Sequence, residues 1–272
     1  MTSDAREFLD PAWDAARAAG TLILDNWQRP KKIDHKGAID LVTSVDRESE
    51  RIIVDILQRN FPDHGFLAEE ETDQRSSLSR YLWIIDPLDG TTNFAHSYPQ
   101  FCVSIALQYD GEVVLGLVYD PIRDECFRAV QGQGATLNQT PIHSSESSEL
   151  DKSLLATGFP YDRRDNADFY LTLFKAFLIS SQGPGRNGSA ALDLCYVACG
   201  RLDGFWELKL KPWDTAAGAL VVKEAGGRLS DFAGKSFSIW GHETLASNGL
   251  IHDEMMRITA ATSRSATSLT GS

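Results

Sequence analysis

The chain has 272 residues, of which 42% are hydrophobic and 24% are charged, a composition typical of globular proteins and unlike that of disordered ones. Its 26 basic and 38 acidic residues give a formal net charge of −12. Proteins that bind nucleic acid or anionic membranes generally need clustered lysine and arginine, so this charge argues against both classes. It suits a soluble protein, or a site that gathers metal cations.

No part of the sequence approaches the run of about twenty apolar residues that a membrane-spanning helix requires. The N-terminus carries several charged residues and lacks the basic start and apolar stretch of a secretory signal peptide. We therefore expect a soluble cytoplasmic protein with neither a nucleic-acid nor a membrane partner.

The first half of the chain is typical of two helices followed by an antiparallel meander. Apolar spacing predicts a helix over residues 4–28, interrupted near Pro11, and a second helix that begins at Asp46. The polar residues 28–40 between them are typical of an exposed loop. Asp110–Gly111 predicts a hairpin turn between two strands. Strands are expected at residues 66–68, 81–86, 101–108, 113–119 and 126–130.

From about residue 154 the pattern mixes strands and helices. The serine-rich stretch 144–153 is the best candidate for a boundary, which predicts two subdomains of a single structural unit, residues 1–150 and 151–272. The last ten residues, 263–272, are expected to be a frayed tail. The elements expected here are a strand at 154–158, a helix at 169–179, a loop at 183–185, a helix at 189–199, a strand at 204–208, a helix at 213–225, two late strands and a final helix.

The segment WIIDPLDGTTNF, residues 83–94, combines acidic residues with potential phosphate-binding amides. An apolar strand ends at Asp86, Asp89 follows a proline turn, and Gly90 begins a stretch of free backbone amides. Two carboxylates this close repel each other unless a cation lies between them, and magnesium favours such oxygen ligands. The alternative is that Asp86 and Asp89 only stabilise a turn and cap a helix. Taken alone, the segment supports both interpretations equally.

Two other acidic positions favour the metal interpretation. Glu69 to Glu71 follow a short apolar strand, and Asp214 stands at the head of an expected helix. By themselves, a charge run is usually a solvated surface and an Asp at a helix start is usually a cap. Their joint occurrence with residues 83–94 points to one site.

These segments resemble the inositol monophosphatase family of magnesium-dependent, lithium-sensitive phosphatases. Five matching segments in the same order, spread between residues 8 and 260, make the resemblance specific. They are KGAIDLVTSVD (36–46), LAEEE (67–71), DPLDGTTNF (86–94), RNGSAALDLCYVACGRLDGFWE (186–207) and WDTAAGALVVKEAGG (213–227).

The resemblance implies a layered α/β sandwich in the order αβαβα, with a larger antiparallel sheet, a smaller mixed sheet and metal ions where the two halves meet. It implies two or three Mg²⁺ ions. Glu69, Asp86 and the backbone carbonyl of Leu88 would hold the first. Asp86, Asp89 and Asp214 would hold the second, and a third, looser ion would lie near Glu69.

The resemblance also implies how the reacting groups are held. The amides of Gly90 and Thr91 would bind the phosphate, and the Thr91 hydroxyl, paired with Asp46, would orient the attacking water together with Glu69. Lys36 would lie on a loop that closes near the metals. The substrate side would be formed by Asp89, Asp214, Arg186, Gly188, Ser189, Ala190, Asp193 and Glu207.

Three of these substrate-side residues have plainer interpretations. Arg186 could bind substrate, support a subunit contact or only cap a surface loop. Asp193 could be a solvated residue on a helix face, and Glu207 could pair with Lys209 or Lys211. The resemblance favours Asp193 and Glu207 as acceptors for the hydroxyls of a sugar or cyclitol.

The function that we expect is Mg²⁺-dependent hydrolysis of inositol monophosphate or a similar polyol phosphate by a metal-activated water, with inhibition by Li⁺ and no phosphoenzyme. A homodimer is expected from the resemblance alone. Alternatives with the same chemistry are fructose 1,6-bisphosphatase, histidinol-phosphatase, and a phosphatase of NADP or 3′-phosphoadenosine compounds. An alternative of another class is a non-catalytic regulatory protein that retains the fold.

Overall fold

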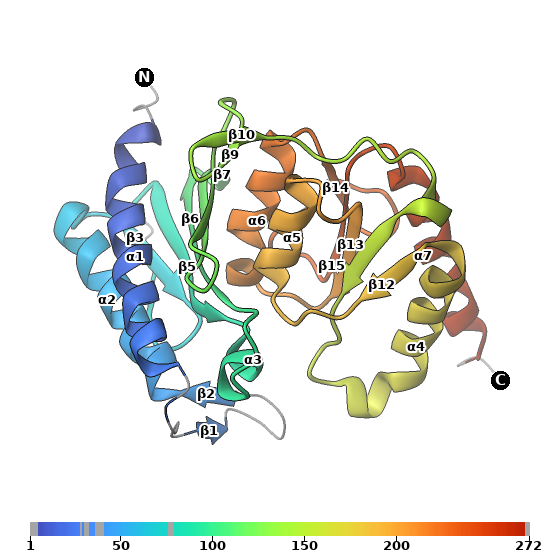
Figure 1. The fold of residues 1–272 in the computed structure, drawn as a ribbon, viewed down its shortest axis with the longest axis horizontal. Coiled ribbons are helices and arrows are strands. Elements are labelled where there is room, and N and C mark those ends of the chain that lie inside the picture. Colours follow the sequence, from blue (N-terminus) through green and yellow to red (C-terminus); the bar gives the residue numbers. More distant parts are fainter. Residues whose placement is uncertain (1–4, 28, 30–32, 36–40, 76–78, 270–272) are drawn as a thin grey trace.

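The computed structural model describes residues 5–27, 29, 33–35, 41–75 and 79–269 of the chain. Helices and sheets alternate in five layers (Figure 1). Two helices cover one face of a large sheet, two lie between this sheet and a smaller one, and two cover the far face of the smaller sheet. The predicted αβαβα sandwich is confirmed.

The outer layer on the large sheet consists of α1 (Leu9–Asn26), preceded by a 3₁₀ turn (Ala5–Phe8), and α2 (Ser44–Asn60). Small side chains on one face of α1 let it pack closely, and a Cβ on Gly20 would collide with the ring of Tyr119. The predicted interruption near Pro11 is wrong. Pro11 lies in the first turn of α1, where a helix needs no backbone donor.

The large sheet has eight strands in the order β10-β9-β8-β7-β6-β5-β3-β4. Its neighbours are antiparallel except for β3 and β5, which run parallel. The predicted hairpin is confirmed, because Asp110 and Gly111 both have positive φ and connect β6 to β7. The strands are β3 (Gly65–Ala68), β4 (Asp73–Gln74), β5 (Tyr81–Asp89), β6 (Cys102–Tyr109), β7 (Glu112–Asp120), β8 (Glu125–Val130), β9 (Ala135–Leu137) and β10 (Thr140–Ile142).

The middle layer consists of α5 (Ala190–Ala198) and α6 (Pro212–Glu224), which are apolar on nearly all sides because a sheet lies on each face. Helix α6 approaches the large sheet so closely that a Cβ on Gly116 would meet the backbone of Ala217. This close contact brings the start of α6 to the edge of the large sheet where its acidic residues lie.

The smaller sheet has five strands in the order β12-β11-β13-β15-β14, with the first three parallel and the others antiparallel. The prediction of a mixed sheet is confirmed. Helices α4 (Arg163–Ser180) and α7 (His252–Leu269) cover its outer face (Figure 1). The strands are β11 (Leu154–Thr157), β12 (Gly183–Gly185), β13 (Gly204–Leu208), β14 (Arg228–Ser230) and β15 (Glu243–Ser247).

Three local expectations were wrong. Part of the expected loop 28–40 forms β1 (Ile33–His35), which pairs with β2 (Leu41–Thr43). Residues 183–185 form strand β12, because the parallel partner β11 supplies the hydrogen bonds that glycine and proline propensity could not predict. Helix α7 continues to Leu269 and so includes most of the expected tail.

Residues 144–153 connect β10 of the large sheet to β11 of the smaller one, with a 3₁₀ turn at Leu150–Lys152. The division of the chain into subdomains at this point stays a prediction. Within the described ranges, no helix has both the length and the apolar character needed to cross a bilayer.

Candidate active site

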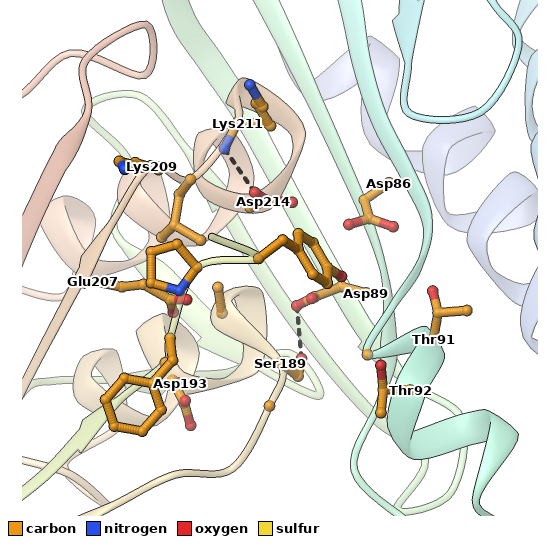
Figure 2. A pocket seen from close by; sticks show the side chains of 18 of the residues that line it. Asp86, Asp89, Thr91, Thr92, Ser189, Asp193, Glu207, Lys209, Lys211 and Asp214 are labelled. Carbon is orange, nitrogen blue, oxygen red and sulfur yellow. Dashed lines mark hydrogen bonds between the residues drawn. The ribbon is translucent and has the colours of Figure 1, made fainter. Parts of the chain in front are cut away.

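A cavity of about 600 Å³ opens where the ends of β5, β11 and β13 meet the starts of α3 (Thr91–Ala95), α5 and α6. Figure 2 shows that side chains from both halves of the chain converge on it. Asp46 does not line it but contacts Thr91, and Lys36 lies outside the described residues. The other predicted site residues all line it: Glu69, Asp86, Leu88, Asp89, Gly90, Thr91, Arg186, Gly188, Ser189, Ala190, Asp193, Glu207 and Asp214.

Strand pairing brings the first three acidic residues to one edge of the large sheet. Ala68 of β3 is in register with Ile85 of β5, and the amide of Glu69 donates to the Ile85 carbonyl at 3.2 Å. Because the two strands are parallel, both end at this edge, and Glu69 therefore lies beside Asp86. The register of β5 against β6 then shifts between Asp86 and Asp89, a bulge that redirects the end of the strand.

Asp214 reaches the same place through α6. Ser104, which pairs with Asp86 across β5 and β6, donates a 3.2 Å hydrogen bond to the carbonyl of Trp213. Asp214 also accepts a 2.6 Å hydrogen bond from the amide of Lys211, so it does cap its helix as the plain interpretation held. The cap uses Oδ2 only, which leaves Oδ1 able to bind something else.

Asp89 joins the two halves of the site. Its Oδ2 accepts hydrogen bonds from the Ser189 hydroxyl at 2.7 Å and from the amide of Ala191 at 2.8 Å (Figure 2). Ser189 is the N-cap residue of α5, so this carboxylate lies at a helix start, where negative charge is favoured. As with Asp214, the second carboxylate oxygen makes neither of these bonds.

The acidic residues destabilise one another's charged forms. Burial, and then repulsion by Glu69 and Asp89, raises the pKa of Asp86 well above its usual value. Burial, and then repulsion by Glu69, does the same to the pKa of Asp214. The pKa of Asp89 is raised by burial and lowered in part by its bond to Ser189. A cation placed among these groups would relieve both the repulsion and the desolvation.

The donor set is entirely oxygen, as hard divalent cations such as Mg²⁺ prefer. Among the described residues, no three His, Cys, Asp or Glu side chains already surround one point closely enough to hold a metal ion. Asp89 and Asp214 each accept a hydrogen bond from a backbone amide. This turns one carboxylate oxygen of each residue toward the backbone, which accounts for part of the separation between the side chains. The residues therefore fit a magnesium site in chemistry and location, and their carboxylates have to turn to form it.

Gly90 and Thr91 directly follow Asp89, where β5 leads into α3. The Thr91 hydroxyl lies 2.8 Å from Asp46 Oδ1 and 3.1 Å from the Leu88 carbonyl oxygen, either of which can accept its proton. Gly90 has φ of 101°, and a Cβ there would come within 2.8 Å of the Gln100 carbonyl oxygen. Only glycine fits this turn, which leads into the short helix α3.

The far end of the cavity carries Asp193 and Glu207 (Figure 2). Asp193 accepts a 2.7 Å hydrogen bond from Asn187, and burial raises its pKa to about 8. Burial also raises the pKa of Glu207 well above its usual value, with repulsion by Asp214 adding to it. The alternative in which Lys209 pairs with Glu207 is wrong, because Lys209 pairs with Asp162.

The sequence interpretation missed one wall of the cavity and the hydrogen bonds of Asn93 beside it. The segment 158–163, which follows the end of β11, lines the cavity with Phe159, Pro160 and Tyr161. Its position after the carboxyl end of a parallel strand was the available signal. The buried amide of Asn93 donates to the carbonyl of Gln100 at 2.7 Å and to that of Asn187 at 2.8 Å. It therefore ties helix α3 to the segment that precedes α5.

Residues 4–267 match the sequence profile of the inositol monophosphatase family. The chain belongs to the inositol monophosphatase family. Among its relatives, it is 48% identical to an inositol-1-monophosphatase of Synechocystis sp. over 96% of this chain and 91% of that protein. It is 42% identical to the Nus factor SuhB of Escherichia coli K12, over 89% of this chain and 90% of that one.

A solved structure of an inositol monophosphatase from Anabaena (Nostoc) sp. PCC 7120 has the same fold, with a TM-score of 0.87 and 44% identity over 95% of this chain and 97% of that one. Full-length matches of this kind confirm the family resemblance drawn from the sequence motifs. The names of the relatives differ, one being a phosphatase and one a Nus factor, so family membership alone does not choose between these activities.

Proposed function

We propose that this member of the inositol monophosphatase family is a Mg²⁺-dependent phosphomonoesterase that hydrolyses myo-inositol 1-phosphate or a similar polyol phosphate. One observation carries the proposal. Glu69, Asp86, Asp89 and Asp214 come from three separate segments of the chain and converge on one cavity. The convergence would be costly without a cation, since burial raises the pKa values of all three aspartates and mutual repulsion raises those of Asp86 and Asp214 further.

Magnesium, held by these four carboxylates and the carbonyl of Leu88, would supply the activated water and neutralise charge on the phosphate and leaving oxygen. The amides of Gly90 and Thr91 would donate to the phosphate oxygens. With its own proton directed to Asp46, the Thr91 hydroxyl would accept a hydrogen bond from the attacking water. Glu69 would accept the other hydrogen bond from that water and so aim its lone pair at phosphorus.

The substrate side supports a polyol as the leaving group. Asp193 and Glu207 would accept hydrogen bonds from substrate hydroxyls, and the raised pKa of Asp193 lets it donate as well when it is protonated. Ser189 and Ala190 stand at the start of α5 between these acceptors and Asp89. The Synechocystis relative, named an inositol-1-monophosphatase, favours a cyclitol over the other polyols.

A panel of phosphate esters tests this proposal. Phosphate release is measured from myo-inositol 1-phosphate, fructose 1,6-bisphosphate, histidinol phosphate and NADP, each with Mg²⁺ and with EDTA. We expect inositol 1-phosphate to have the highest kcat/KM and every activity to vanish in EDTA. A higher kcat/KM for one of the other three esters would reassign the substrate within the same chemistry, and release that persists in EDTA would contradict the metal mechanism.

Three further family properties belong to the proposal: inhibition by Li⁺, a homodimer and a cytoplasmic location. One variant distinguishes the two roles considered for Arg186, a subunit contact and substrate binding. If it supports a subunit contact, Arg186→Ala should shift the sedimentation coefficient toward that of a monomer. If it binds substrate, the same change should raise KM and leave sedimentation unaltered.

A second candidate function is a non-catalytic regulatory role on the same fold, and the name of the Escherichia coli relative favours it. Retention of all four acidic residues in one cavity weighs against it, because a protein released from catalysis has no need to keep them together. Absence of turnover on the whole ester panel, in a folded preparation supplied with Mg²⁺, would favour this second candidate.

A further inference from the structure

Glu50 is a carboxylate buried inside the protein at 2% exposure, one helical turn after Asp46 on α2. Its oxygens accept three backbone hydrogen bonds from consecutive residues of the loop after β3. Oε2 accepts from the amide of Glu70 at 2.7 Å, and Oε1 accepts from the amides of Glu71 at 3.0 Å and Thr72 at 2.7 Å. Three such bonds to one charged group fix a loop far more firmly than neutral bonds would.

This loop carries Glu69. It closes on itself through a 2.7 Å hydrogen bond from the amide of Ala68 to the Thr72 carbonyl, and the amide of Glu69 is bound to β5. Glu50 therefore holds the three amides that immediately follow Glu69, while β5 holds the amide of Glu69 itself. The backbone on both sides of this acidic residue is fixed.

Asp46 and Glu50 stand four residues apart, so they lie on the same face of α2. Asp46, itself 1% exposed, binds the hydroxyl of Thr91, and Glu50 binds the loop of Glu69. One rigid helix turn thus sets the spacing between the two elements that carry Thr91 and Glu69. In the mechanism proposed above, these are the two residues that hold the attacking water.

We propose that Glu50 is a positioning residue: it contacts neither metal nor substrate, and it aims Glu69 at the metal site in register with Thr91. The inference rests on the proposed function. Its predicted effects are on Mg²⁺ affinity and on the order of the loop, and both can be measured without substrate. Groups that orient a metal ligand commonly change metal affinity by about 10–100-fold when they are removed.

Glu50→Gln is the direct test, because it removes the negative charge and replaces one carboxylate oxygen with an NH2 group. That NH2 group cannot accept a hydrogen bond, so at least one of the three backbone amides loses its acceptor. We expect the Mg²⁺ dissociation constant, measured by calorimetry without substrate, to rise by about tenfold or more. We also expect faster hydrogen exchange in a peptide covering residues 70–72 of the metal-free protein, with the strand 102–109 unchanged. Glu50→Asp, which keeps both oxygens on a shorter stem, should show a smaller change in the same direction.

Two variants serve as matched controls. Ser49 is the neighbouring buried residue on α2, and its hydroxyl has no hydrogen-bond partner among the described residues, so Ser49→Ala should leave Mg²⁺ affinity unchanged. Asp120, at the end of β7, is a fully buried carboxylate that accepts hydrogen bonds from the backbone amides of Ile122 and Arg123. It does not line the cavity. Asp120→Asn should lower the unfolding temperature as Glu50→Gln does, yet keep Mg²⁺ affinity.

Unchanged Mg²⁺ affinity in Glu50→Gln would overturn the proposal, and so would an equal loss in Asp120→Asn, since the effect would then be general destabilisation. If Glu50→Gln does not fold, the same comparison is made with Glu50→Asp. Failure of the proposed function is a separate result: the wild-type protein would bind Mg²⁺ and release no phosphate from any ester, while the Glu50 measurements would stand.

Discussion

Ser189 donates a 2.7 Å hydrogen bond to Asp89, which lies 100 residues earlier in the chain. The residue that caps α5 is therefore attached to a carboxylate at the end of β5. This bond connects the start of α5 to the acidic residues at the end of β5, and it engages Oδ2 of Asp89.

Asp89→Asn tests whether this carboxylate holds the metal. The amide oxygen of Asn can still accept from Ser189 and Ala191, so the fold should persist while a charged metal ligand is lost. We expect kcat on inositol 1-phosphate to fall by more than about a hundredfold, since even the removal of supporting groups around a metal commonly costs 10–100-fold. A steady-state assay together with a circular dichroism spectrum measures both. Near-normal turnover would show that Asp89 does not hold the metal.

Glu207 and Gly158 together define a test of leaving-group recognition. The Cα of Gly158 faces the carboxylate of Glu207 so closely that a Cβ there would overlap its oxygens. Glu207→Gln and Gly158→Ala should therefore both raise KM for inositol 1-phosphate, the first by weakening the acceptor and the second by displacing it.

The same two variants should hydrolyse p-nitrophenyl phosphate almost as the wild type does, because this ester has no hydroxyls for Glu207 to bind. The ratio of kcat/KM values for the two esters is the quantity to compare. An equal loss on both esters would place Glu207 outside the recognition of the leaving group.

The sequence motifs singled out most of the acidic residues that line the cavity, because these residues lie at strand ends and helix starts, where local patterns are strong. Asp86 ends an apolar run and Asp214 lies in the first turn of a helix, and both positions can be located from periodicity and caps. They meet because α6 packs on the large sheet at Gly116 and is bound to β6 by the Ser104–Trp213 hydrogen bond, which no local pattern encodes.

The features that the sequence interpretation missed also depend on contacts between residues that are far apart in the sequence. Glu50 is one polar position on an amphipathic helix, and only the fold shows that three amides of a distant loop converge on it. Likewise, β12 contains two glycines and a proline and becomes a strand only because β11 lies next to it.

Lithium should inhibit hydrolysis if the acidic cluster has the geometry expected of the family. Li⁺ is a small hard cation that favours oxygen ligands, so it should compete for a site built from Asp86, Asp89 and Asp214. The measurement is phosphate release at fixed Mg²⁺ across a series of LiCl concentrations, with NaCl at matched ionic strength as the control. Equal curves in the two salts would count against this geometry.

His252 gives the protein a pH dependence that is separate from catalysis. Its ring is fully buried and hydrogen-bonded to Ser247 at 2.9 Å and Ser230 at 2.8 Å, and burial lowers its pKa to about 4. The unfolded chain binds a proton near pH 6.5, so stability is fully present above that pH and is lost as pH falls toward 4. We expect a loss of about 2 kcal/mol over this window, allowing for solvent screening.

Urea unfolding at several pH values measures this effect against His252→Gln, which cannot take up the proton. The wild type should lose about 2 kcal/mol more than the variant between pH 7 and pH 4. His96→Gln, at an exposed position, is the control and should follow the wild type. Parallel pH curves for the wild type and His252→Gln would show that His252 is not the group responsible.

The most direct test of the central claim is a crystal structure of the protein with Mn²⁺ and phosphate, in which anomalous scattering locates each metal ion. We predict manganese within bonding distance of Glu69, Asp86, Asp89 and Asp214, with the phosphate against the amides of Gly90 and Thr91. Manganese bound elsewhere, with Asp89 and Asp214 still turned toward their backbone partners, would contradict the account.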